Sequence, residues 1–552
     1  MRTLSLHDAL VGVLTATLVF VVLFWRLGDA TFWDPDEAHY AETSREMIAT
    51  GDWWAPYYNE QPFFDKPVLF HQLQASAMRL VGDPELGART VSALAALGLI
   101  LVTRWFAATV ISREVANVAT LMLAGSPGIF ALSRYAILDT LFTLFTFGGA
   151  ACLAVSALRD RPRLQWLGYV ALALGVLVKG PLALVLAALT LLVLIAASPD
   201  LRQRLLALHW FVGLLVIVAV SGPWFVYMYL RFWQAFVDGY VLDENVRLFA
   251  ASRFANQPGF WFYFQILATG LLPWTGLLVG RMVDDLRCVW RGERVDHAET
   301  MLWAWTLAIV SFFTASTFKL DHYVFPAAPA LCVLCARAWT DVRLHHREPS
   351  TAASRVGLYF IGPFLVAVGL GCGWFLIARL ELPRAAIVVP VALTVAGALL
   401  TALANVRGAL PPRIPWAVTS ALIVTYAGVI LFVLPALEQR KTVPDIAHWV
   451  AAHAQAADRI ASYRMNRWTP AYRFYVGRHV RLLEEPAEAE AFFNKPEPFY
   501  CVMRRNAFDE FVAQGAKLEV VYERDGMTAT TGRALWRSRT PFTRFVVVAK
   551  PR

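Results

Sequence analysis

The chain has 552 residues, of which 58% are hydrophobic and 16% are charged, and its mean hydropathy is +0.50. Soluble domains have about 45–50% apolar and about 25% charged residues, so this composition excludes an ordinary soluble protein and indicates a polytopic membrane protein. The formal net charge is +9, but Lys and Arg lie mostly in short loops between apolar runs. That pattern is typical of cytoplasmic loops and argues against a nucleic-acid-binding protein.

Apolar runs recur along most of the chain. A transmembrane helix needs about 17 to 25 mostly apolar residues, and by this criterion we predict about thirteen spans. The first run is predicted to be a span and not a signal peptide, because it has no clear small-residue cleavage site. The spans are expected near residues 8–26, 87–110, 114–132, 137–157, 164–179, 181–198, 206–230, 260–280, 300–317, 322–340, 356–378, 385–405 and 414–435.

The charge of the connecting loops orients these spans. Several basic loops fall on the same side, which is therefore predicted to be cytoplasmic. An odd number of spans then puts the N-terminus in the cytoplasm and everything after about residue 436 outside. The basic loops are residues 159–163, 201–204, 281–294, 341–347 and 407–413.

The chain is expected to form two domains. Residues 1–437 are predicted to be a transmembrane catalytic domain whose first periplasmic loop, residues 27–86, is long. Within this loop, residues 36–53 and 66–82 are predicted to be helices along the membrane surface that stop at glycines. Residues 438–552 alternate helix and strand patterns and are predicted to be a periplasmic α/β domain.

Three carboxylates, Asp34, Asp36 and Glu37, directly follow the first span in "WDPDEAHYAE". Acids at the edge of the hydrocarbon must face water, a cation or a substrate. The alternative is a solvated helix N-terminus, with an Asp as its cap and Glu37 favouring the helix dipole. Asp139, at the outer start of the fourth span, shares the face of Asp36 and could either border the same cavity or cap its own helix.

Six cations from different loops are expected on the same outer face. Each alone is more typical of a side chain that reaches to the membrane interface than of a ligand contact. Together they suit a phosphate-bearing lipid, since ammonium and guanidinium groups offset its charge where water is scarce. With acids beside them, the site fits transfer of a sugar from a lipid phosphate. The cations are Arg45, Lys66, Lys179, Arg247, Arg253 and Lys319.

A divalent metal is left open, and no other cofactor is required. Three histidines reach the outer face near acids, but no pair has the close spacing of a catalytic zinc site. The candidate metal ligands are His39, His71 and His322, with Asp36, Glu37 or Glu60.

Six stretches carry a family resemblance. They are "DPDEAHYAETSREMIATGDWWAPYYNEQPFFDKP", "SRYAILDTLFTLF", "LGVLVKGPLAL", "ENVRLF", "PGFWFYFQILATGLLPW" and "STFKLDHYVFPAAPAL", within residues 30–335. Taken together and in this order, they resemble the bacterial branch of the protein O-mannosyltransferase-like glycosyltransferases, which have the membrane-embedded GT-C architecture. Within that branch they are most similar to the lipid A aminoarabinose transferases. The linked set is specific for the superfamily, while each fragment alone is weak.

The resemblance implies which residues form the site. This sequence also departs from the family at several positions. The family's acids match Asp36, Glu37 and Asp139. Its remaining motif residues match Lys66, Lys179, Lys319 and Tyr323. The departures are His39, where Arg is expected, Asp65, where Glu is usual, and Asp321 with His322, which replace less polar residues.

The resemblance also implies an activity. The chain would move 4-amino-4-deoxy-L-arabinose from undecaprenyl phosphate to a phosphate of lipid A at the periplasmic face of the bacterial inner membrane. Its partners would be this lipid-linked donor, the lipid A acceptor and membrane lipids. Such a modification of lipopolysaccharide lowers the negative charge of the outer surface and is associated with polymyxin resistance.

The acceptor determines what the acids must do. A lipid A phosphate is already an anion and needs no strong general base. We therefore expect Asp36, with Glu37 or Asp139, to pair with the sugar's ammonium group or with the positive charge that develops at the anomeric carbon. Other groups would hold and orient the leaving undecaprenyl phosphate. These are Lys66, Lys179, Arg247, Lys319 and Tyr323.

Two other activities stay open. If the acceptor were a Ser or Thr hydroxyl of an exported protein, as in O-mannosylation, Asp36 would act as a general base. A flippase for lipid-linked sugars would have inverted repeats with broken helices near the bilayer midplane, whereas these acids lie at one interface. The C-terminal domain could position lipid A through Arg464, Arg467 and Trp468, or could only cap the catalytic loops.

Overall fold

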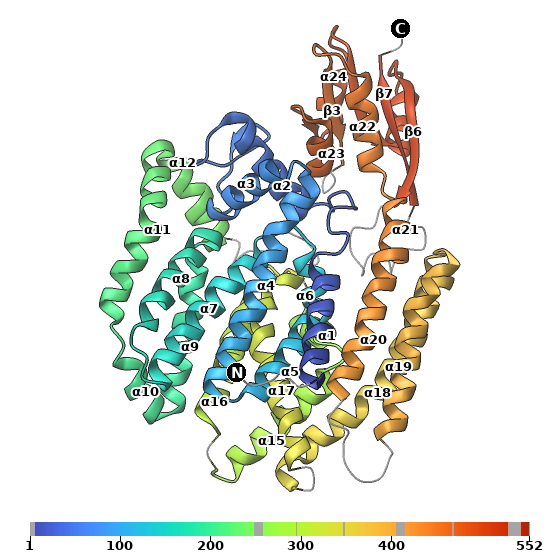
Figure 1. The fold of residues 1–552 in the computed structure, drawn as a ribbon. Coiled ribbons are helices and arrows are strands. Elements are labelled where there is room, and N and C mark those ends of the chain that lie inside the picture. The colour runs from blue at the N-terminus through green and yellow to red at the C-terminus, as the bar shows by residue number, and fades with distance from the viewer. Residues whose placement is uncertain are drawn as a thin grey trace.

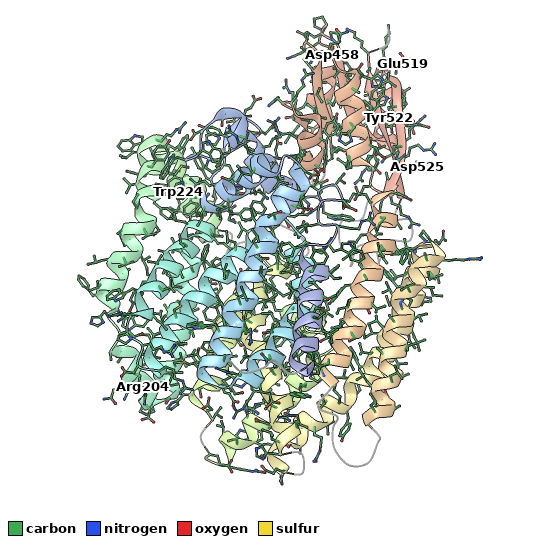
Figure 2. All side chains as sticks on the ribbon, in the orientation of Figure 1. Arg204, Trp224, Asp458, Glu519, Tyr522 and Asp525 are labelled. Carbon is green, nitrogen blue, oxygen red and sulfur yellow. The ribbon has the colours of Figure 1, made fainter. Side chains whose placement is uncertain are left out.

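The structure is a computed structural model that describes residues 6–247, 258–293, 295–345, 348–404, 414–465, 469–527 and 542–550. Arg253, Arg467 and Trp468 lie outside these residues. Figure 1 shows a tall body of helices with a smaller sheet-containing unit at one end. In Figure 2, Arg204 lies at the end opposite to Asp458 and Glu519 of the sheet-containing unit. The protein is therefore a helical multi-span membrane protein with an added α/β unit.

Eight helical segments of the described chain are long and apolar enough to cross a membrane, and two bent pairs raise the number to as many as ten. Three shorter apolar helices accompany them, α1 (Leu6–Leu23), α8 (Leu164–Lys179) and α9 (Leu182–Ala197). The count of thirteen spans therefore stays a prediction. The long segments contain α4 (Pro84–Val110), α7 (Asp139–Leu158), α11 (Trp210–Phe232), α16 (His297–Ala315), α17 (Ala328–Leu344), α18 (Ala352–Gly373), α19 (Val388–Ala404) and α20 (Ile414–Gly428) with α21 (Leu434–Glu438).

Two of the predicted straight spans are bent. In the first, α5 (Arg113–Ala124) and α6 (Pro127–Ser133) meet at 59°. Proline lacks a backbone N–H and is favoured at the start of a helix, so α6 restarts at Pro127 in a new direction. In the second, α14 (Phe262–Gly270) and α15 (Thr275–Trp290) meet at 117°. The apolar runs were identified correctly, but their composition alone did not indicate the bends.

The first outer loop folds into two helices and a short hairpin above the helical body. They are α2 (Asp36–Thr50), β1 (Tyr57–Tyr58), β2 (Gln61–Pro62) and α3 (Leu69–Val81). Both helices end before a left-handed glycine, Gly51 with φ 72° and Gly82 with φ 77°, as the sequence predicted. Helix α2 does not lie open on the membrane surface, because more than half of its residues are buried.

The C-terminal region forms an α/β unit, as predicted. Its sheet has the order β4-β3-β5-β7-β6, in which β3 pairs parallel to β4 and β5 while β7 pairs antiparallel to β5 and β6. One helix, α23 (Thr469–Val476), was not predicted. The elements are α22 (Val443–His453), β3 (Arg459–Tyr463), α23, β4 (Arg481–Leu483), α24 (Pro486–Phe493), β5 (Phe499–Arg504), α25 (Arg505–Ala513), β6 (Glu519–Met527) and β7 (Phe542–Ala549).

Candidate functional site

Asp139 and Lys179 meet at the outer ends of two neighbouring helices. Asp139 begins α7 and Lys179 ends α8, and these two helices pack against each other. Gly180, with φ 78°, and the following proline end α8 at the lysine. The Lys179 ammonium lies 2.5 Å from Asp139 Oδ1 and 4.3 Å from the centre of the Tyr323 ring. Two motifs that are 40 residues apart therefore form one buried ion pair.

His322 lies on the other side of the same carboxylate. Its Nε2 is 3.6 Å from Asp139 Oδ2, and its Nδ1 is 3.2 Å from Asp321 Oδ1. Asp139 and His322 are buried, at 2% and 9% exposure, whereas Asp321 is exposed. The departure of the sequence at residues 321–322 therefore adds a polar group directly to the Asp139 site.

Lys66 provides a second cation from the first outer loop. Its ammonium donates to Glu244 Oε2 at 3.0 Å and to the carbonyl of Asp65 at 2.9 Å. Glu244 lies in η1 (Val237–Arg247), inside the "ENVRLF" stretch that the sequence had singled out for its arginine. The partner of Lys66 was missed because 178 residues separate the two.

Lys66, Lys179 and Tyr323 line a common pocket, which we call the outer pocket. Helices α8, α9 and α16, η1, the first outer loop and the segment after α16 contribute its walls. Its lining carries both charges and aromatic rings, which suits a phosphate with an apolar tail. The lining residues are Asp65, Lys66, Lys179, Leu182, Tyr240, Glu244, Asn245, Phe312, Phe313, Ser316, Phe318 and Tyr323.

Tyr40 links Asp36 to Asp139. Burial is the main cause that raises the pKa of the Tyr40 phenol, and the charges of Asp36 and Asp139 raise it further. The charges of both acids therefore act on the same phenol. The expectation that Asp36 and Asp139 share a face and a cavity edge is thus consistent with the electrostatics around Tyr40.

Glu37 is engaged in a buried ion pair. Its Oε1 lies 2.7 Å from Arg89 Nε, and its Oε2 accepts from Arg89 Nη2 at 3.0 Å. The backbone N–H groups of Trp33 and Ala136 also donate to it, each at 2.9 Å. Both oxygens of this fully buried carboxylate are satisfied by the protein. Glu37 therefore fixes the start of α2 against α4 and the segment before α7, and its predicted catalytic role is untested.

Three of the predicted substrate-binding cations are not in the lining of the outer pocket. Arg45 pairs with Glu42 on its own helix at 2.7 Å. Arg247 is exposed and pairs with Asp243 at 2.5 Å. Lys319 donates to the carbonyl of Ser316, which itself lines the pocket. Substrate contacts of these three residues stay predictions.

The histidines of the first loop are buried without charge. Burial lowers the pKa of His39 to about 4 and that of His71 to about 3. Among the residues that the structure describes, the Nε2 atoms of both rings have no hydrogen-bond partner, whereas His71 Nδ1 lies 3.3 Å from the Ser44 hydroxyl. Within the described residues, no three His, Cys, Asp or Glu side chains are arranged to hold a metal ion.

The chain is similar to one known protein family and to several known proteins. The family described as dolichyl-phosphate-mannose-protein mannosyltransferase matches residues 12–240. The undecaprenyl phosphate-alpha-4-amino-4-deoxy-L-arabinose arabinosyl transferase of Aeromonas salmonicida is 30% identical over 361 residues, which are 63% of this chain and 63% of that protein. The chain thus matches somewhat less than two thirds of the length of this relative. These matches confirm the resemblance inferred from the sequence motifs.

Solved structures identify the fold. The crystal structure of ArnT from Cupriavidus metallidurans bound to undecaprenyl phosphate has a TM-score of 0.72 and 22% identity, and the match covers 98% of this chain and 97% of that one. The oligosaccharyltransferase of Archaeoglobus fulgidus has a TM-score of 0.52 and 12% identity, covering 93% and 69%. The predicted GT-C architecture, including the C-terminal unit, is confirmed at the level of the fold.

Proposed function

We propose that the chain is a glycosyltransferase that moves 4-amino-4-deoxy-L-arabinose from undecaprenyl phosphate to a phosphate of lipid A. The observation that carries the proposal is the outer pocket, which Lys66, Lys179 and Tyr323 line and whose Lys179 pairs with the buried Asp139. The names of the similar proteins support the same donor. The reaction takes place at the periplasmic face of the inner membrane, with the N-terminus in the cytoplasm and the C-terminal unit in the periplasm.

The cations hold the leaving phosphate. In the structure, Lys66 is paired with Glu244 and Lys179 with Asp139. A donor phosphate in the outer pocket shares these two cations with their carboxylates and takes a hydrogen bond from Tyr323. When the bond between the anomeric carbon and the phosphate oxygen breaks, its electron pair stays on that oxygen. The cations stabilise this growing charge more than they stabilise the bound donor, which lowers the barrier.

The two acids act on different parts of the donor. The acceptor phosphate oxygen is an anion, so it attacks the anomeric carbon without losing a proton to a base. Asp36 pairs with the ammonium group of the aminosugar or with the positive charge that develops on the ring. Asp139 keeps Lys179 in place at 2.5 Å and acts on the phosphate through it. The two acids therefore serve opposite ends of the breaking bond.

A second candidate is O-mannosylation of exported proteins, favoured by the mannosyltransferase family that matches residues 12–240. A Ser or Thr hydroxyl must lose its proton as it attacks, so Asp36 would then be the general base. In this reaction Asp36→Asn slows transfer while the donor remains bound. In aminoarabinose transfer, the same change weakens binding of the charged sugar.

The two reactions are separated by offering both donors and both acceptors to the purified protein in lipid vesicles. The donors are undecaprenyl phosphate carrying aminoarabinose or mannose, and the acceptors are lipid A and a Ser/Thr peptide. We expect product only from the aminoarabinose donor on lipid A. Product only on the peptide would assign the chain to protein glycosylation. No transfer, combined with movement of the donor across the bilayer, would assign it to lipid-linked sugar transport.

A further inference from the structure

The segment that leads into Asp36 is held by the C-terminal unit. The backbone N–H of Phe32 donates to the hydroxyl of Tyr475 at 2.8 Å. Oδ1 of the Asp34 carboxyl group accepts from the backbone N–H of Ala471 at 2.9 Å. Both partners lie in α23, more than 400 residues further along the chain. The backbone just before Asp36 is therefore placed by a helix of another domain.

Arg473 of α23 holds the helix that Asp36 begins. Its Nε lies 2.8 Å from Glu42 Oε1 and its Nη2 lies 2.8 Å from Glu46 Oε1. All three side chains are buried, with exposures of 2%, 0% and 5%. Glu46 also accepts from the backbone N–H groups of Asn59 and Glu60 at 2.7 and 3.0 Å. One guanidinium thus ties α2 and the hairpin to α23.

Apolar packing continues across the same contact. The rings of Phe32 and Phe474 meet edge to face with centroids 4.9 Å apart. Ala38 and Ala41 of α2 belong to the same buried cluster as Tyr472 and residues of the C-terminal sheet. Figure 1 shows α23 beside α2, at the end of the helical body that carries the outer loop. The two domains share a core here, which resists relative movement.

We infer that the C-terminal α/β unit positions Asp36, with α23 as the contact element and Arg473 as the main positioning residue. The inference rests on the proposed function, because Asp36 is the acid proposed to act on the sugar. A misplacement of about 1 Å in a catalytic group can cost on the order of 100-fold in rate, so a unit that fixes this segment contributes directly to turnover. The alternative role, capture of lipid A, would involve residues such as Arg464, whose guanidinium bonds the carbonyl of Glu484.

The test compares Arg473→Met with a matched control, Arg544→Met, which breaks an exposed ion pair with Asp525 in the same unit. For Arg473→Met we expect kcat to fall roughly 10- to 100-fold, while KM for donor and acceptor changes by less than about twofold. Hydrogen–deuterium exchange of residues 31–46 should become faster in the same variant. Arg473→Lys keeps a charge between the two carboxylates and should lie between wild type and Arg473→Met. Arg544→Met should change neither kcat nor the exchange of residues 31–46.

A milder variant covers the case in which Arg473→Met does not fold. Tyr475→Phe removes only the hydroxyl that accepts from Phe32 and donates to Glu85 at 2.7 Å, and should lower kcat severalfold with faster exchange near Phe32. Unchanged kcat in both variants, or a rise in acceptor KM at constant kcat, would overturn the inference. If the wild type transfers to no acceptor, the proposed function fails. Hydrogen–deuterium exchange is then the remaining test of the inference. An unchanged exchange rate of residues 31–46 in the variants contradicts positioning by α23, and a faster rate supports it.

Discussion

At the scale of single residues, the site consists of cations that already have anionic partners. Lys179 lies against Asp139 and Lys66 against Glu244. A buried cation without a partner would be costly, so these pairs hold the ammonium groups in place until a phosphate arrives. Asp36 stands beside this arrangement as the acid closest to the sugar in the proposed reaction.

Asp36→Asn should lower the rate of transfer to lipid A by roughly 100- to 1000-fold, because the amide does not stabilise positive charge on the sugar. Binding of an aminoarabinose donor should weaken, whereas binding of undecaprenyl phosphate without a sugar should not. The control is Asp238→Asn at an exposed position in η1. An amide at this position can keep the hydrogen bond with Gln234. Equal losses in both variants would remove Asp36 from the site.

Substitutions of Lys66 and of its partner Glu244 should change the Kd of undecaprenyl phosphate in opposite directions. Lys66→Met removes a charge-assisted bond to the phosphate and should raise the Kd of undecaprenyl phosphate roughly 10- to 100-fold. Glu244→Gln removes a negative charge that competes for the same ammonium and should lower that Kd severalfold. The measurement is titration of each variant in nanodiscs. Weaker binding in Glu244→Gln would mean that the phosphate does not share Lys66 with Glu244.

Sequence motifs singled out several residues of the candidate site, and the residues that they missed have a common cause. Asp36, Asp139 and Lys179 were identified from motifs, because acids and lysines at the ends of apolar runs are rare. Glu244 and Arg473 were missed because each acquires its role from a partner far away in the chain. Periodicity and spacing report only local neighbours.

At the scale of elements, the first outer loop is a framework for Asp36. Arg89 of α4 was not singled out from the sequence, although a charge in a predicted membrane helix was the available signal. Helices α2 and α3 were predicted nearly to their ends by their glycine stops. Helix α23 was missed because eight residues with a proline and several aromatics show no clear helical period.

Arg89→Met should destabilise the protein by about 3–5 kcal/mol, because it leaves the buried Glu37 carboxylate without its partner. The double variant Glu37→Leu/Arg89→Met removes both charges and should recover a large part of this loss. Thermal unfolding in detergent would measure both. A double variant as unstable as Arg89→Met alone would show that the backbone contacts of the two side chains, and not the ion pair, hold the helices together.

At the scale of the whole molecule, the titratable groups of the outer loop should produce a stability maximum near neutral pH. His39 and His71 are neutral in the fold, with pKa values of about 4 and about 3 compared with 6.5 in the unfolded chain. Their contribution is therefore complete above pH 6.5 and is lost as the pH falls below it. Burial raises the pKa of Asp34 from 3.8 to about 8, so its contribution is lost as the pH rises towards 8.

Each group whose protonation differs between the folded and unfolded states changes the free energy of unfolding by about 1.4 kcal/mol per pH unit. Between about pH 4 and 6.5, the two histidines outweigh Asp34 and stability should rise with pH. Above pH 6.5 only the Asp34 contribution changes, so the free energy of unfolding should fall as the pH rises to 8. His71→Phe should flatten the plot of stability against pH below pH 6.5, and Asp34→Asn should flatten it above pH 6.5. Unfolding midpoints measured from pH 4 to 8 would contradict this assignment if neither variant changed the profile.

The predicted domain boundary stays a prediction, and the contact between the helical body and the C-terminal unit was not predicted. The change from apolar runs to alternating patterns predicted a boundary near residue 437, which falls within α21. The packing of α23 on α2 depends on buried surfaces of two segments more than 400 residues apart. No local pattern reports such a pairing, so the sequence could not choose between a capping and an acceptor-binding role for the C-terminal unit.

The most direct measurement is mass spectrometry of lipid A from bacteria that make the aminoarabinose donor but lack their own transferase. Expression of the wild-type chain should add the mass of an aminopentose to lipid A phosphate groups, and expression of Asp36→Asn at the same level should not. Unmodified lipid A in the wild-type strain, together with sugar on exported proteins, would contradict the account.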